Sequence, residues 1–283
     1  MRKLEIETSV AKFQMAVSHL LLTLSNVMEL LWDHTFGKQE HQDLVICRPM
    51  AIVEHDEEET ALESGWLALD HPLNGKEVFY QSRSTRVNLD RYKPRFSNYE
   101  YEGKKIGYKI IDASEMVNLL SLPYIYKKYM KRKKFCEDYD PFGHYHQRDQ
   151  FMIFYLGTAD NIVGFTKQKR YSYGEDHNID IDDIDTMQCS GVESVLHANT
   201  IPISAETLDI EMMWAAESRI PYYYLGSGYE QSSEYKASWQ GFQWWTGTEW
   251  STNKSQYRRL CNRDSRLTDF SSLGNLSLIL NKT

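Results

Sequence analysis

The feature that most constrains the fold is an aromatic stretch near the C-terminus, Ile220 to Trp245. It opens with a run of apolar and aromatic residues, Tyr222 to Leu225, which follows a proline and precedes two glycines, Gly226 and Gly228. Such a run is typical of a buried central strand, and the glycines mark where the backbone opens. Polar residues follow the strand: Ser232, Ser233, Tyr235 and Lys236. We expect ligands at this edge, as in open α/β sheets.

A helix is predicted just before this strand. Leu208, Met212 and Ala215 recur at helical spacing, so the pattern predicts an amphipathic helix over Ala205 to Arg219 with Ser204 as its cap. Gly191 to Ile203 is rich in branched apolar residues and predicts another strand. The order strand, helix, strand is that of a βαβ unit, in which the two strands are parallel neighbours.

Two hairpins are also predicted. Met152–Leu156 and Ile162–Phe165 are apolar runs separated by a turn at Gly157–Asn161, and Asn74-Gly75 is a strong turn signal within Gly65 to Lys93. A further strand is expected over Asp43 to Val53, and a long amphipathic helix over Thr8 to His34. The fold class is therefore α/β (α+β), with a mixed sheet flanked by helices.

Two sequence blocks carry a family resemblance. Ile-Pro-Tyr-Tyr-Tyr-Leu-Gly from Ile220, followed by Tyr-Lys-Ala from Tyr235, resembles the pattern Leu-Pro-Tyr-x-Tyr-Leu-Gly-Tyr and Met-x-Tyr-Lys-Ala of the arginyl- and leucyl-tRNA–protein transferases. Gly65-Trp66 and the stretch Tyr80 to Pro94 are similar to that family's N-terminal half. The resemblance extends over residues 61–245 and implies the fold of the GNAT acyltransferases. The domains expected are an N-terminal helical extension (1–60), a GNAT-like transferase domain (61–250) and a C-terminal tail (251–283).

The resemblance also implies a set of site residues. Tyr235 and Lys236 match the family's Tyr-Lys and would hold the donor's ester or a phosphate, and Arg86 matches a family arginine that would bind the donor's anionic end. His197 and Glu193, on the preceding predicted strand, are the nearest candidates for a general base, although a structural role for His197 is at least as plausible. Arg83, Arg86, Arg91, Lys93 and Arg95 form a basic run that suits either anion binding or a solvated edge.

Two further clusters suggest contact with nucleic acid. A predicted helix over Ser114 to Lys134 ends in a basic group: Lys127, Lys128, Lys131, Arg132, Lys133 and Lys134. Such a group either forms a solvated helix end or contacts phosphates. Aromatic residues including Trp244 and Trp245 lie beside the predicted site, where they either stack on bases or belong to the core.

Composition and missing motifs exclude several classes. The net charge of −8 argues against a surface that grips nucleic acid as a whole. Four scattered cysteines signal neither zinc nor disulfides, and the acidic run Asp176 to Asp185 lacks EF-hand spacing, so no metal is expected. No pyrophosphate-binding glycine loop lies between Leu196 and Ser204, which makes coenzyme A a poor candidate. No signal peptide or membrane span is predicted, so we expect a cytoplasmic protein without membrane contact.

The leading hypothesis is an aminoacyltransferase that moves an amino acid from aminoacyl-tRNA, or a related activated donor, to an amine acceptor without a cofactor. An aminoacyl ester is already activated, so the enzyme has only to position the amine, take its proton and stabilise the oxyanion. One alternative is an enzyme that attaches an amino acid or acyl group to a modified DNA base, as some proteins of this fold do. The other is a non-catalytic nucleic-acid-binding module. Oligomeric state stays open.

Overall fold

The computed structural model describes residues 30–39, 42–69, 77–112, 121–133, 142, 149–172, 189–228 and 231–264. The strands are β1 (Leu30–Gln39), β2 (Gln42–Ile52), β3 (Trp66–Ala68), β4 (Val78–Gln81), β5 (Ser84–Asn88), β6 (Glu100–Tyr101), β7 (Lys104–Asp112), β8 (Asp149–Leu156), β9 (Ile162–Ser172), β10 (Cys189–Asn199), β11 (Tyr222–Ser227), β12 (Phe242–Trp245) and β13 (Trp250–Ser251). The helices are α2 (Glu58–Glu63), α3 (Ser121–Lys133), α4 (Ser204–Glu217) and α5 (Lys254–Asp264), with short 3-10 segments η1 (His55–Glu57), η2 (Leu89–Arg91) and η5 (Gln231–Ser238).

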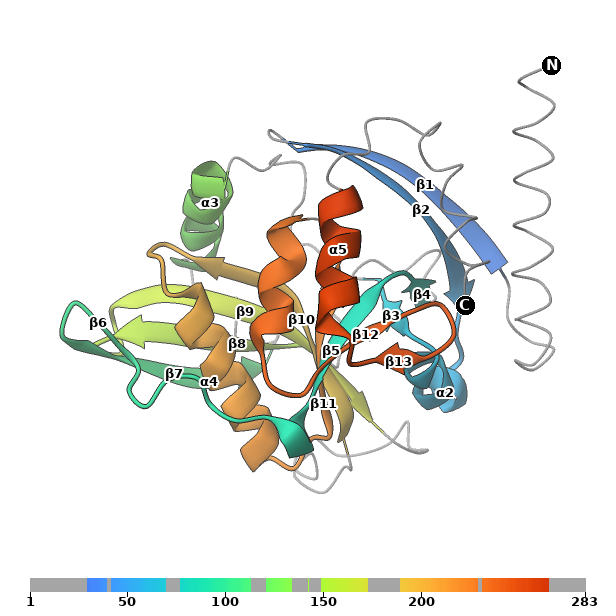
Figure 1. Ribbon diagram of the computed structural model, residues 1–283. Coiled ribbons are helices and arrows are strands. Elements are labelled where there is room, and N and C mark those ends of the chain that lie inside the picture. The colour runs from blue at the N-terminus through green and yellow to red at the C-terminus, as the bar shows by residue number, and fades with distance from the viewer. Residues whose placement is uncertain are drawn as a thin grey trace, which may run out of the picture.

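The strands form two sheets (Figure 1). The large one has nine strands in the order β13-β12-β5-β11-β10-β9-β8-β7-β6, and the small one has four in the order β1-β2-β4-β3. In the large sheet β10 and β11 are parallel, whereas β8 and β9 form an antiparallel hairpin. These observations confirm the predicted βαβ unit, the predicted hairpin around Gly157 and the predicted mixed sheet flanked by helices, an arrangement compatible with a GNAT-like fold.

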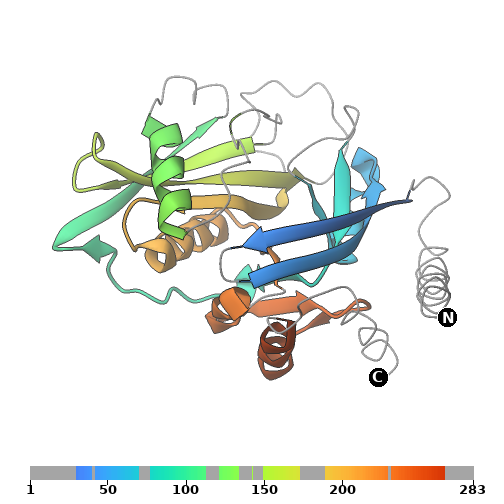
Figure 2. The ribbon, with the colours of Figure 1, turned by 90° about the horizontal axis from the view of Figure 1, so that it is seen from above.

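Helices cover both faces of the large sheet because its strands alternate apolar residues between them. On β8, Phe151 and Ile153 pack against α3, whereas Met152 and Phe154 pack on the face that carries α4. The segments η5 and α5 lie on the α4 face, where Tyr257 of α5 packs against Phe242. The small sheet and α2 cover the other face, beside α3. Figure 2 shows the long β1–β2 hairpin crossing over the body of the molecule.

A buried carboxylate in α4 secures the segment between β5 and β6. Asp209 has no exposed surface and accepts hydrogen bonds from the backbone N–H groups of Arg95 and Phe96 at 2.9 and 3.1 Å. It also accepts hydrogen bonds from the hydroxyl groups of Tyr92 and Tyr99 at 2.6 and 3.0 Å. The segment is thereby fixed across α4, and the pKa values of both phenols are raised by burial and by the neighbouring carboxylate.

Some predicted elements differ in the structure. Positions 30–34 of the predicted N-terminal helix belong to β1, because they pair with β2 in a long hairpin; the rest of that helix lies outside the described residues. Helix α4 begins at Ser204 itself, so Ile203 occupies the N-cap position and no side chain caps the helix. The predicted Asp43–Val53 strand is confirmed as β2, and the predicted antiparallel pairing after Gly65 as β3–β4.

The predicted domain limits remain predictions. The small sheet combines β2 with β3 and β4, so it takes strands from both sides of position 60. Helix α5, in the predicted tail, packs against η5 and β12. The Asn74-Gly75 turn, the acidic run Asp176 to Asp185 and the end of the tail lie outside the described residues.

Candidate functional site

The two central parallel strands part where the sequence predicts a ligand site. The β10–β11 ladder covers two residue pairs and ends at Glu193 and Tyr224, although both strands continue. On the other side of β10, the ladder to β9 skips Val195, which marks a β-bulge. Positions 194–197 are partly exposed although β10 lies in the middle of the sheet. We refer to residues 194–199 and 225–228 as the β10–β11 fork.

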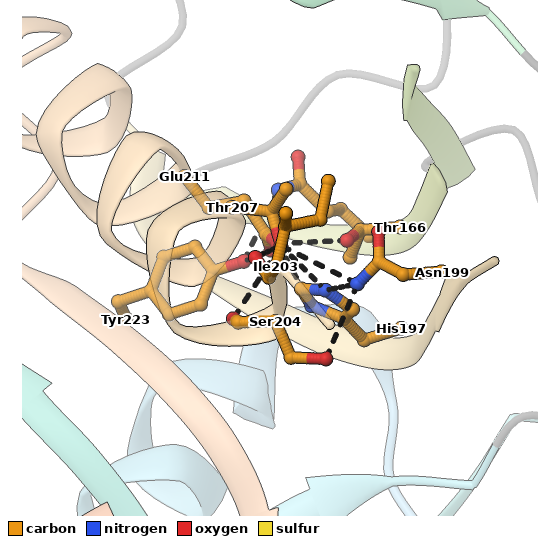
Figure 3. A network of polar contacts seen from close by, with 9 residues as sticks. Thr166, His197, Asn199, Ile203, Ser204, Thr207, Glu211 and Tyr223 are labelled. Atoms are coloured by element: carbon orange, nitrogen blue, oxygen red, sulfur yellow. Dashed lines mark hydrogen bonds and ion pairs between the residues drawn. The ribbon is translucent and has the colours of Figure 1, made fainter. Parts of the chain in front are cut away.

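A buried carboxylate organises the α4 side of the fork (Figure 3). Glu211 has no exposed surface, and its Oε1 accepts a hydrogen bond from the Thr166 hydroxyl at 2.7 Å. Its Oε2 accepts hydrogen bonds from the Tyr223 hydroxyl and, at 3.3 Å, from the Gln168 amide. Burial and the charge of Glu211 raise the pKa of Tyr223 well above its usual value. A fully buried carboxylate is stable only when several hydrogen-bond donors surround it, and Thr166, Tyr223 and Gln168 donate to Glu211.

His197 belongs to this network, and both of its ring nitrogens have protein partners. Nδ1 lies 3.0 Å from Glu211 Oε1, and Nε2 lies 2.7 Å from the Thr207 hydroxyl and 2.6 Å from the Asn199 amide nitrogen. A carboxylate beside Nδ1 favours a proton on that nitrogen. To accept a proton from a substrate, Nε2 would have to exchange one of its two partners. The geometry therefore favours a positioning role, and the base role of His197 remains a prediction.

Glu193 lies on the opposite face of the sheet from His197. Residues four apart in a regular strand share a face, but the bulge at Val195 shifts the alternation by one. Glu193 faces the small sheet and accepts a hydrogen bond from the Tyr171 hydroxyl at 2.5 Å, with 3% of its surface exposed. The structure therefore does not bring the two predicted base candidates together.

Tyr235 is the predicted site residue most open to solvent. Its side chain is 54% exposed, yet its surroundings raise the pKa of the phenol to about 12. Burial is the main cause, and Tyr129 of α3 and Glu211 of α4 contribute. More than half of the residue is open to solvent. The phenol stays protonated at neutral pH, so it can donate a hydrogen bond or a proton there.

Lys236, the neighbour of Tyr235, points into the protein. Its Nζ donates to the carbonyl groups of Leu225 and Ser227, both at 2.6 Å, and only 8% of the residue is exposed. These two carbonyls flank Gly226, whose φ of 71° belongs to the left-handed region. Lys236 thus holds the carboxyl end of β11 in its turn. This position suits a positioning residue, and no substrate contact follows from it.

The two serines and the two arginines predicted for substrate binding occupy different settings. Ser232 is exposed on η5, and the backbone carbonyl of Ser233 accepts a hydrogen bond from the Tyr257 hydroxyl at 3.1 Å. Arg83 is buried and donates to the carbonyl of Gly228 at 3.2 Å. Arg83 therefore supports the Gly228 end of the fork through a backbone carbonyl.

Arg86 is enclosed by aromatic rings. Its guanidinium lies 3.8 Å from the ring centre of Tyr222 and 3.9 Å from that of Trp250, and Nε donates to Gln243 Oε1 at 2.8 Å. It faces the small sheet and is 6% exposed. Both flat faces of the guanidinium are occupied, so this position does not suit the predicted contact with a donor's anionic end.

The C-terminal aromatic residues are core. Trp244 and Trp245 are 2% and 7% exposed, and Trp239 is fully buried. The Trp245 ring packs on Gly65 so closely that a Cβ at that position would overlap it. Stacking on an extruded base requires an open ring face. The predicted stacking role of Trp244 and Trp245 therefore does not fit their burial.

Helix α3 presents its cations to solvent and its apolar residues to the sheet. Leu122, Ile125 and Met130 are buried, whereas the predicted phosphate contacts Lys127, Lys128, Lys131, Arg132 and Lys133 are all exposed. Lys134 lies outside the described residues. Arg132 Nη2 also donates to the carbonyl of Asn199 at 2.7 Å, which links the basic face to the end of the fork. Helix α3 is placed so that a polyanion bound on it would lie beside the fork.

Sequence reasoning missed the carboxylate at the centre of the network. Asp209 and Glu211 both lie within the buried part of α4, whose pattern predicts an apolar stripe. The two acidic residues inside this apolar stripe were the sequence signal for the network, since buried carboxylates need hydrogen-bond partners. Within the part of the chain that the structure describes, no three His, Cys, Asp or Glu side chains are grouped to hold a metal, and no helix has the length and apolar character needed to cross a membrane.

Comparisons with known proteins give little further guidance. No protein-family model matches the sequence, and no curated protein matches it. Seven solved chains match, and one of them is the C-terminal domain of a protein described as a lysylphosphatidylglycerol synthetase from Agrobacterium fabrum. The match has 8% identity and a TM-score of 0.34, and it covers 59% of this chain and 50% of that chain. This chain thus spans half the length of that structure. A match this weak supports no conclusion about activity.

Proposed function

We propose that the protein is an aminoacyltransferase that moves an aminoacyl group from an activated ester, such as aminoacyl-tRNA, to an amine at the β10–β11 fork. The observation that carries this proposal is the parting of two central strands at a bulge, beside the exposed Tyr235 phenol. Val195 has no register partner in either ladder, and its backbone N–H is the donor that we assign to the carbonyl oxygen that becomes negative in the transition state. No cofactor is needed, because the ester is already activated.

Tyr235 is the candidate acid in this reaction. The amine nitrogen attacks the ester carbon, a C–N bond forms, and the ester C–O bond breaks with the electron pair going to the leaving oxygen. That oxygen needs a proton, and the attacking amine loses one. A phenol with a pKa of about 12 is protonated at neutral pH; it gives its proton to the leaving oxygen and takes the proton that the amine loses, so it ends the reaction protonated again. Lys236 stabilises the fork through its hydrogen bonds to the carbonyls of Leu225 and Ser227, and Glu211 does so through the hydrogen bonds it accepts from Thr166 and Tyr223.

A transfer assay tests this proposal. Purified protein is incubated with radiolabelled aminoacyl-tRNAs and candidate amine acceptors, and label in the acceptor is counted. Tyr235→Phe should lower the transfer rate by about 100-fold or more, the usual contribution of a positioned acid. Tyr124→Phe, a matched change at the other well-exposed aromatic residue (58% exposed), should leave it unchanged. Absence of transfer from every aminoacyl-tRNA would make the donor assignment wrong.

The exposed basic face of α3 supports a second candidate, a non-catalytic nucleic-acid-binding module. In that case Tyr235→Phe and Lys236→Ala would leave the biological activity intact, while neutralising the α3 cations would abolish it. The alternative in which DNA is the acceptor loses its stacking surface, because Trp244 and Trp245 are buried. A DNA-modifying enzyme would therefore have to hold the base by other side chains.

A further inference from the structure

A cavity of about 350 Å³ lies between the end of β5 and the start of α5. Its walls come from the segment after β5, the turn before β12, β12 itself and the first residues of α5. The lining residues are Asp90, Arg91, Tyr92, Lys93, Gln240, Gly241, Phe242, Gln243, Thr252 and Lys254. Typical small-ligand pockets measure about 300–1,000 Å³, so this cavity is large enough for a small metabolite.

The lining carries more positive than negative charge. Arg91, Lys93 and Lys254 stand against a single acid, Asp90, in a chain with a net charge of −8. Lys254 Nζ donates to the Trp239 carbonyl at 2.5 Å, but among the described residues Arg91 and Lys93 have no acidic partner and lie at the exposed rim. Two unpaired cations beside a cavity attract an anion. Together with Arg95, these residues are also the part of the basic run Arg83 to Arg95 that the sheet does not bury.

The cavity is separate from the fork. Strand β5 is antiparallel to β11, with Ser84 beside Ser227 and Asn88 beside Tyr222. The fork therefore lies at the Ser84 end of β5, and the cavity follows its Asn88 end. Five strand residues span about 15 Å, so one small ligand cannot occupy both places. Ligand binding in the cavity is independent of the proposed transfer reaction.

We propose that this cavity binds a phosphate ester of mononucleotide size. The Arg91 guanidinium and the Lys93 ammonium would hold the phosphate, since an arginine fork matches phosphate oxygens and a lysine adds a point charge. The half-buried Tyr92 supplies an apolar wall for a base. Asp90, Gln240 and Thr252 supply acceptors and donors for sugar hydroxyl groups. A lone inorganic phosphate would use the cations but leave the apolar wall uncovered.

Titration calorimetry of the full chain with AMP and with inorganic phosphate tests this inference. Arg91→Gln/Lys93→Gln should weaken AMP binding at least about tenfold, because two charge-assisted contacts are lost. Lys104→Gln/Lys105→Gln removes the same charge from β7 and serves as the matched control. Gln240→Trp fills the cavity without a charge change and should also weaken AMP binding. All four cations are exposed, so unchanged thermal unfolding of these variants is expected.

Several results would overturn the inference. If AMP does not bind, or binds no more tightly than inorganic phosphate, the cavity does not take a nucleotide-sized ester. Equal losses in the two double variants would mean that net charge, and no particular site, attracts the anion. AMP binding that survives both Arg91→Gln/Lys93→Gln and Gln240→Trp would place the ligand elsewhere. None of these results depends on aminoacyl transfer, so the two proposals can fail independently.

Discussion

Lys236 shows how far a side chain's role depends on its direction. The family resemblance suggests contact with the donor, whereas its ammonium group lies between the carbonyls of Leu225 and Ser227. A buried lysine with two carbonyl acceptors stabilises the turn at Gly226 by two charge-assisted hydrogen bonds. Because this turn leads directly out of the fork, Lys236 fixes the carboxyl end of β11 at the fork.

The first prediction concerns this residue. Lys236→Met keeps the apolar part of the side chain but leaves two buried carbonyls without their donor, so the free energy of unfolding should fall by about 2–4 kcal/mol. Urea unfolding followed by circular dichroism measures the change. Lys127→Met, at an exposed position on α3, should change it little. A Lys236→Met protein of wild-type stability that has lost transfer activity would instead indicate that the ammonium acts on the substrate.

At the scale of single elements, helix α4 stabilises two different parts of the protein through two buried carboxylates. Glu211 points to the fork and Asp209 to the segment between β5 and β6. Asp209→Asn replaces an oxygen that accepts hydrogen bonds by an NH₂ group that faces other donors. The second prediction is a loss of about 2–4 kcal/mol in the free energy of unfolding, measured by urea titration. Asp160→Asn, in the exposed β8–β9 turn, is the control. A similar loss of stability there would mean that the effect of Asp209→Asn does not come from its buried hydrogen bonds.

The third prediction concerns α3. If its exposed face contacts phosphates, Lys127→Gln/Lys128→Gln/Lys131→Gln should weaken tRNA binding. It should also reduce the slope of log affinity against log salt concentration by about two to three, because each phosphate contact releases one counterion. The matched control is Lys104→Gln/Lys105→Gln/Lys109→Gln, which removes three exposed cations from β7. Filter binding at several salt concentrations measures the affinity and the slope for each variant. Equal slopes in the two variants would assign the effect to net charge.

The elements were more predictable from the sequence than the site. Apolar runs and turn residues were enough to predict β8, β9, β10, α4 and β11, because each is a continuous stretch of apolar residues or a helical repeat that ends at turn residues. The bulge at Val195 leaves no such signal, yet it places His197 and Glu193 on opposite faces. The enclosure of Arg86 by Tyr222 and Trp250 depends on residues far apart in the chain, which one sequence without its fold does not bring together.

At the scale of the whole molecule, the interior repeatedly pairs a buried carboxylate with a tyrosine. Glu193 accepts from Tyr171, Glu211 from Tyr223, and Asp209 from Tyr92. In each pair the phenol donates to the carboxylate, so the charged group is stabilised only while the phenol keeps its proton. Burial and the adjacent carboxylate raise the pKa of Tyr171, Tyr223 and Tyr92 above the usual value of 10.0.

The last prediction follows from these raised pKa values. Below about pH 10 the phenols are protonated in both the folded and the unfolded chain, so their contribution to stability is fully present. Above that pH the unfolded chain releases the protons while the folded protein retains them. Each such tyrosine then lowers the free energy of unfolding by about 1.4 kcal/mol per pH unit. Stability should therefore fall steeply between about pH 10 and 11, as urea unfolding at each pH would measure.

Two variants separate this linkage from general alkaline damage. Tyr171→Phe should make the fall shallower by about 1.4 kcal/mol per pH unit, because one proton fewer is released on unfolding. Tyr124→Phe, at an exposed position, should keep the wild-type slope. The part of the tyrosinate absorbance that comes from the buried phenols should rise together with the loss of the far-ultraviolet circular dichroism signal, since these phenols ionise only when the chain unfolds. If all phenols ionised gradually while the dichroism stayed native, the carboxylate–tyrosine pairs would have to be open to water, and the buried networks described for Glu193, Glu211 and Asp209 would be wrong.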